Sequence, residues 1–221
     1  MLTDWRMKDF DVGAGLATHA FDNDARSADW VDVSAPGDTY LALHAAGRLP
    51  DPFADQNEAR CAWVIDREWW WRCDFTTPAV RPGERLQLNF LGLDTFATVW
   101  LNGEVIGEAD NMFRPYVFDV TDRLAASGVN RLAVRFDPPA DRLKNVEPPL
   151  WPGMGFTVGV NKRNMVRKAQ FGWGWDWGPT LPTVGLWRPV TLEVVAPVGL
   201  DDVHFWTESI AADHHEAKVG V

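Results

Sequence analysis

The sequence predicts an all-β protein, a β-sandwich with one short helix and one long loop rich in aromatic residues. Short runs of β-branched and aromatic residues recur along the chain, separated by Gly, Pro, Asn and Asp at the spacing typical of a sandwich. The clearest of these runs flank an Asn-Gly pair, which favours the tight turn of a hairpin. The chain has 221 residues, of which 46% are hydrophobic and 24% charged, so it can bury a core and is neither disordered nor fibrous.

One short helix is expected over residues 38–46. Asp38 is a candidate N-cap, because its carboxylate can accept hydrogen bonds from the free amides of the first turn. Gly47 follows as the C-terminal stop, since glycine readily takes the left-handed conformation that ends a helix.

The first strong strand is expected over residues 67–75. Side chains alternate between the two faces of a strand, so Trp69, Trp71 and Cys73 share one face, which we predict to be core. Trp70 lies on the other face, and we expect it to be exposed or to form an interface.

A hairpin is expected over residues 95–106, with its turn at Asn102 and Gly103, which have no other role. The remaining strands of the sandwich are predicted at residues 85–91, 114–120, 131–136 and 187–195.

The long loop covers residues 137–183, where repeated prolines interrupt regular structure. Its six Trp and Phe residues argue against disorder, and a loop of this length in a compact domain is usually functional. A new strand pattern begins after Pro197, and the chain stops as another strand starts at 217–221. We therefore expect one domain over residues 1–197, followed by the truncated start of another over 198–221.

Charge and hydropathy exclude several partners. The formal net charge is −10, with 31 acidic and 21 basic residues, and no basic stripe could follow a phosphate backbone. We expect no nucleic-acid partner and no membrane partner. The N-terminus has no basic region followed by an apolar stretch, so no signal peptide is visible and a cytoplasmic location is expected.

Motifs for self-contained catalysis are missing from the sequence. It has no Gly-x-Ser-x-Gly elbow, no Gly-rich phosphate loop and no His-Glu-x-x-His. Its two cysteines, Cys61 and Cys73, have no His or Cys neighbour at zinc-ligand spacing, and we expect both to be reduced and partly buried. We predict no catalytic residue, no metal and no cofactor in this chain.

The most specific local feature is an aspartate between two tryptophans, Trp175-Asp176-Trp177. A carboxylate in this setting can accept hydrogen bonds from a pair of sugar hydroxyls while the aromatic faces cover the C–H surface of the ring. The alternative is structural, with the tryptophans in the core and Asp176 capping a turn beside Gly178-Pro179. The residue chemistry alone leaves both interpretations open.

Several ordered motifs resemble the N-terminal sugar-binding domain of β-mannosidases in glycoside hydrolase family 2. They extend over about residues 30–197, and their order and spacing make chance a poor explanation. The motifs are Pro36-Gly37-Asp38, Asp51-Pro52-Phe53, Asn57-Glu58, 92–99 (GLDTFATV), Leu101-Asn102-Gly103, 111–114 (NMFR), 174–179 (GWDWGP) and 185–190 (GLWRPV).

The resemblance implies a jelly-roll, galactose-binding-like sandwich, followed in a whole enzyme by an immunoglobulin-like domain, which residues 198–221 would begin, and a (β/α)8 barrel. In that family the barrel carries both catalytic glutamates. The family consists of retaining enzymes, and it removes terminal β-D-mannose from non-reducing ends. The expected partners are therefore a β-mannoside and the downstream domains, and the 221-residue chain alone should be inactive.

The resemblance also gives roles to individual residues. The family's aspartate that reaches the −1 mannose falls on Asp176, with Trp175 and Trp177 beside it as further substrate-binding residues. Arg167 and Lys168 match as a loop pair that holds Asp176 or a neighbouring carboxylate. The pair Asn57-Glu58, in a predicted loop, is a candidate rim or interdomain contact. Trp173 stands where the family more often has Phe, which keeps an aromatic ring.

Two other functions remain open. One is a stand-alone carbohydrate-binding module on the same sandwich. The other is a structural sandwich of another family 2 glycosidase, a β-galactosidase or a β-glucuronidase, in which Asp176 never meets the sugar.

Overall fold

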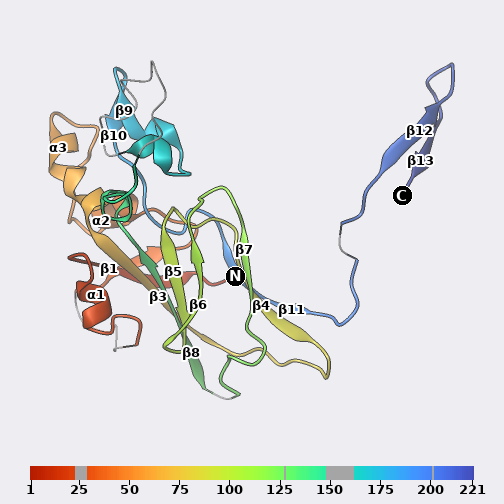
Figure 1. Ribbon diagram of the computed structural model, residues 1–221, viewed down its shortest axis with the longest axis horizontal. Helices are drawn as coiled ribbons and strands as arrows, with labels where there is room; N and C mark the ends of the chain where they lie inside the picture. The colour runs from red at the N-terminus through yellow and green to blue at the C-terminus, as the bar shows by residue number, and fades with distance from the viewer. Residues whose placement is uncertain (23–28, 127, 148–161, 201) are drawn as a thin grey trace.

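The computed structural model describes residues 1–22, 29–126, 128–147, 162–200 and 202–221 (Figure 1). Its strands are β1 (Asp4–Phe10), β2 (Val31–Ser34), β3 (Glu68–Thr76), β4 (Arg85–Phe90), β5 (Ala97–Leu101), β6 (Glu104–Ala109), β7 (Tyr116–Asp119), β8 (Val129–Phe136), β9 (Trp173–Trp175), β10 (Gly178–Thr180), β11 (Val190–Val195), β12 (Trp206–Ile210) and β13 (Ala217–Gly220). Its helices are α1 (Ala14–Ala17), α2 (Thr39–Ala45), α3 (Asn57–Cys61) and α4 (Pro139–Arg142), with 3-10 turns η1 (Ala62–Asp66), η2 (Arg163–Met165) and η3 (Gln170–Gly172).

Two antiparallel sheets form the predicted sandwich. One has six strands in the order β2-β1-β3-β8-β5-β6, and the other has three in the order β11-β4-β7. Both sheets contribute to one core, which includes Trp69 and Trp71 of β3 and Leu88 and Phe90 of β4. The strands predicted at 67–75, 85–91, 114–120, 131–136 and 187–195 are confirmed as β3, β4, β7, β8 and β11, whereas β1 and β2 were not predicted.

The local turn signals act as expected. Asn102 and Gly103 take φ angles of 52° and 87° between β5 and β6, which confirms the predicted hairpin. The carboxylate of Asp38 accepts hydrogen bonds from the amides of Tyr40 at 2.8 Å and Leu41 at 3.2 Å, so it caps α2 as predicted. Gly47, just beyond the helix, has φ +70°. The other three α-helices are one or two turns long and carry no comparable sequence signal.

The prediction that Trp70 is exposed or at an interface is wrong. Alternation does separate Trp70 from Trp69 and Trp71, but both faces of β3 are covered, and Trp70 is 0% exposed. It belongs to a second apolar cluster with Trp30 and Trp100. Phe21, which follows α1, packs against this cluster, so the N-terminal segment covers the outer face of the six-stranded sheet.

Both cysteines are free and buried, as predicted. Burial raises the pKa of Cys73 to about 12, so its thiol stays protonated at neutral pH. The predicted strand at 217–221 is confirmed as β13, which pairs with β12 in a hairpin that lies away from the sandwich (Figure 1). Among the described residues, no helix is long and apolar enough to cross a membrane.

Candidate functional site

The residues Trp175, Asp176 and Trp177 form the tip of a small hairpin. Strand β9 pairs with β10 so that Trp175 lies opposite Gly178, which leaves Asp176 and Trp177 as the two residues of the turn. Trp175 is 67% and Trp177 82% exposed, and Asp176 is exposed between them. The hairpin therefore presents a carboxylate flanked by two aromatic side chains to solvent.

The Asp176 carboxylate makes no hydrogen bond or ion pair to any other described residue. A turn-capping aspartate would accept bonds from nearby backbone amides, as Asp38 does at α2. The structure gives no capping role to Asp176, so all of its acceptor capacity is available to a ligand.

The base of the hairpin is well anchored. Trp173 is 6% exposed, and the amide of Leu181 donates to the carbonyl of Gly172 at 2.9 Å. Gly174 has φ +82°, and an added Cβ there would lie 2.4 Å from the hydroxyl of Thr180, so a residue with a side chain would be strained at this position. The tip thus projects from an ordered stem.

Glu58 contacts the hairpin from α3. The sequence predicts a loop at Asn57-Glu58 with a rim or interdomain contact, whereas these residues begin α3. The carboxylate of Glu58 accepts a hydrogen bond from the amide of Thr180 in β10 at 2.7 Å. Its contact in this structure is therefore with the hairpin of its own domain.

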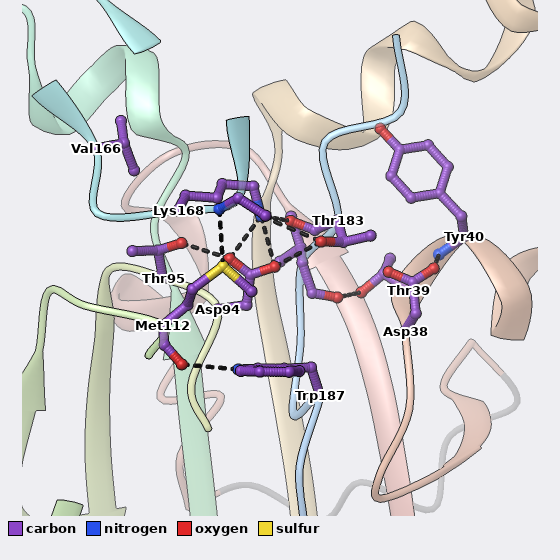
Figure 2. Close-up of polar contacts among 12 residues, drawn as sticks. Asp38, Thr39, Tyr40, Asp94, Thr95, Met112, Val166, Lys168, Thr183 and Trp187 are labelled. Carbon is purple, nitrogen blue, oxygen red and sulfur yellow. Dashed lines mark hydrogen bonds and ion pairs between the residues drawn. The ribbon is translucent and has the colours of Figure 1, made fainter. Parts of the chain in front are cut away.

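A buried ion pair lies below the hairpin (Figure 2). The ammonium of Lys168 is 2.5 Å from the carboxylate of Asp94, and these side chains are 2% and 0% exposed. Lys168 also donates to the carbonyl of Thr183 at 2.5 Å and to its hydroxyl at 3.2 Å. The hydroxyls of Thr183, at 2.6 Å, and of Thr95 both donate to Asp94. Burial lowers the pKa of Lys168, while the Asp94 carboxylate opposes this shift.

The predicted pair Arg167 and Lys168 holds neighbouring carboxylates and not Asp176. Lys168 binds Asp94, and Arg167 binds Asp110 at 2.9 Å on the surface. The sequence left both possibilities open, and the structure selects the second. Asp94 belongs to a motif that carries the family resemblance, but no sequence signal marked Asp94 or Thr183 as the partners of Lys168.

An apolar cavity of about 350 Å³ opens beside the ion pair. Phe113 and Phe171 at its wall are 57% and 82% exposed. Trp187, also in the wall, donates its indole N–H to the carbonyl of Met112 at 2.9 Å (Figure 2). Asp38 contributes a carboxylate whose Oδ2 is buried without a hydrogen-bond partner, and burial raises the pKa of this group.

Two wider hollows, of about 700 and 850 Å³, open along β1 and β2 and are lined by a mixture of charged, polar and apolar side chains. Within the described part of the chain, no group of three or more His, Cys, Asp or Glu side chains is arranged to hold a metal ion.

Comparison with known proteins gives consistent matches. Residues 18–188 match the family model described as glycosyl hydrolase 2 galactose-binding domain-like. A curated β-mannosidase B from Aspergillus terreus is 40% identical over 99% of this chain and 25% of its own length. Its counterpart from Thermothelomyces thermophilus is 48% identical over 72% of this chain and 19% of its own length. The chain spans about a quarter of the length of the curated relatives that it matches.

Solved structures show the same fold. A β-D-mannosidase from Dictyoglomus thermophilum superposes with a TM-score of 0.79 at 32% identity, over 99% of this chain and 25% of that protein. An exo-chitosanase from Amycolatopsis orientalis superposes with a TM-score of 0.70 at 20% identity, over 99% of this chain and 23% of that protein, and this likeness concerns the fold alone.

Proposed function

Because the chain belongs to the glycosyl hydrolase 2 galactose-binding domain-like family, we propose that it is the N-terminal substrate-binding domain of a retaining exo-β-mannosidase. The whole enzyme would remove terminal β-D-mannose from the non-reducing ends of its substrates. The β-mannosidases among its relatives support this substrate, and the exposed Trp175-Asp176-Trp177 tip supplies a chemical basis for sugar contact.

The unpaired carboxylate of Asp176 is the observation that carries the proposal. A carboxylate accepts charge-assisted hydrogen bonds from two neighbouring hydroxyls, which are stronger than bonds between neutral groups. The apolar face of a pyranose ring packs on an indole, and Trp175 and Trp177 are both exposed at the tip. Asp176 would contact hydroxyls of the −1 mannose, with the tryptophans excluding water around it.

The chemical step would take place outside this chain. Retaining hydrolysis needs a general acid and a nucleophilic carboxylate about 5 Å apart, and the resemblance assigns both to glutamates of a barrel domain. We propose that residues 1–197 form the sugar-binding domain and that 198–221 begin an immunoglobulin-like domain. The β12–β13 hairpin supports this boundary, because two strands alone are marginally stable and need further strands to pack against.

The test is Asp176→Ala in the full-length enzyme, assayed on an aryl β-mannoside. Hydrogen bonds to a charged group contribute about 1.5 to 3 kcal/mol, so kcat/KM should fall roughly ten- to a hundredfold or more. Asp176→Asn should be nearly as damaging, because the amide keeps the shape and loses the charge. Asp122→Ala, at an exposed aspartate on the β7–β8 turn, is the matched control and should leave kcat/KM unchanged.

An unchanged kcat/KM in a folded Asp176→Ala enzyme would show that this aspartate never meets the sugar, leaving the sandwich with a structural role. The 221-residue chain alone should show no turnover and should bind mannose only weakly, at about millimolar Kd or above, because half of the site is missing. Tight mannose binding by the chain alone would instead support a stand-alone carbohydrate-binding module.

A further inference from the structure

Asp176 lies in a segment that begins at Lys168 and ends at Thr183, and these two end residues bind each other. The ammonium of Lys168 donates to the carbonyl and the hydroxyl of Thr183. Both side chains also bind Asp94, so the three residues hold the two ends of the segment together. We call this point, where the segment joins the sandwich, its neck. Figure 2 shows these contacts converging on the Asp94 carboxylate.

Each end of the neck is also fixed to the sandwich through the backbone. Asp94 lies between β4 and β5, its amide donates to the carbonyl of Gly185 at 3.0 Å, and the amide of Gly185 donates back at 3.2 Å. On the other side, the amide of Met112 donates to the carbonyl of Arg167 at 3.0 Å. The neck therefore has a defined place on the rigid part of the fold.

Above its anchored base the hairpin has no further strand to pair with in the described part of the chain: β9 and β10 pair with each other, and side chains from outside reach them through Glu58, which accepts from β10, and Arg163, which donates to the carbonyl of Trp173 in β9 at 3.4 Å. A two-stranded hairpin is marginally stable in water, so the position of its tip depends on what holds its base. A displacement of about 1 Å in a substrate contact can lower the rate about a hundredfold.

We propose that Asp94, Lys168 and Thr183 form a clasp that sets the position of Asp176, so that these three are positioning residues for sugar recognition. The Thr183 hydroxyl completes the clasp, because it accepts from Lys168 and donates to Asp94. The link to recognition rests on the proposed function of Asp176. The ordering of the hairpin by the clasp does not, and it can be measured separately.

The test replaces Thr183 in the full-length protein and follows both hydrogen exchange and kinetics. Thr183→Val removes the bridging hydroxyl while keeping the branched shape of the side chain and the carbonyl that accepts from Lys168. Amide exchange in peptides covering residues 172–181 should become about tenfold faster, with β3 and β8 unchanged. The value of kcat/KM on an aryl β-mannoside should fall about five- to tenfold.

Two further variants serve as controls. Thr183→Ser retains the hydroxyl and should stay within about twofold of the native exchange rates and kcat/KM. Arg167→Gln breaks the exposed Arg167–Asp110 pair next to the clasp and should change neither quantity.

The outcomes separate the clasp from the function of Asp176. Native exchange at 172–181 in Thr183→Val, or faster exchange spread evenly over the sandwich, would overturn the clasp. Faster exchange confined to 172–181 with native kcat/KM would keep the clasp as a device that orders the hairpin and would reject its link to sugar recognition, whereas the role of Asp176 itself is decided by Asp176→Ala.

Discussion

Breaking the buried pair of Asp94 and Lys168 should destabilise the fold far more than breaking the exposed pair beside it. Lys168→Met removes the ammonium and keeps an unbranched apolar chain. The carboxylate of Asp94 is then left at 0% side-chain exposure, with the hydroxyls of Thr95 and Thr183 as its remaining donors. Removing one partner of a buried pair typically costs about 3 to 5 kcal/mol, because the other charge stays desolvated.

The loss of stability expected in Lys168→Met can be compared with the loss expected when the neighbouring exposed pair is broken. Arg167 and Asp110 have side chains that are 65% and 55% exposed, and exposed pairs contribute about 0 to 1 kcal/mol. For a protein of this size, 1 kcal/mol corresponds to about 2 to 4 °C in Tm. Lys168→Met should therefore lower Tm by roughly 6 to 20 °C, and Arg167→Met by no more than about 4 °C.

Urea titration and thermal unfolding, both followed by circular dichroism, measure these differences. Combining Asp94→Asn with Lys168→Met removes both charges, so the double variant should be more stable than Lys168→Met alone. A cost below about 1 kcal/mol for Lys168→Met, or one no larger than that of Arg167→Met, would contradict this prediction, because breaking the buried pair would then matter no more than breaking an ordinary surface pair.

Two further predictions concern Gly15 and Asp38. A Cβ at Gly15 would lie 2.0 Å from the indole nitrogen of Trp70, so Gly15→Ala should cost about 1 to 3 kcal/mol in urea unfolding, whereas Gly199→Ala, with open space around it, should cost little. Burial raises the pKa of Asp38 above 3.8, because the buried carboxyl group is more favourable in its protonated form. The stability that this protonated group contributes is fully present below pH 3.8 and is lost as pH rises through the folded-state pKa. The stability of Asp38→Asn relative to the native protein should therefore increase with pH across that window, and a difference independent of pH would contradict the assignment.

Elements with local signals could be predicted from the sequence. The turn at Asn102-Gly103 needs two residues that tolerate positive φ, and the sequence places them between two alternating runs. The cap at Asp38 likewise depends only on the next three residues. These features are fixed by contacts within a few positions, so they can be recognised before any tertiary structure is known.

The covered outer face of β3 could not be predicted in this way. It depends on the N-terminal segment, in which the amide of Gly13 donates to Glu68 at 2.9 Å across 55 positions of sequence. The carbonyl of Asp22 accepts from Arg131 across 109 positions. Alternation correctly divided the tryptophans of β3 between two faces, but it does not show whether an outer face meets water or another segment.

The pairing of charges around the hairpin joins the fold to the proposed function. A buried ammonium needs hydrogen-bond acceptors to offset the loss of water around it. The sequence alone did not show whether Lys168 binds Asp176 or a neighbouring carboxylate. The choice depends on Asp94, which is 74 positions away in the chain. A carboxylate that recognises sugar hydroxyls needs unused acceptor capacity, and an internal ion pair would reduce it. Because Lys168 binds Asp94 and Arg167 binds Asp110, neither cation pairs with Asp176, and its carboxylate stays unpaired at the tip of the hairpin.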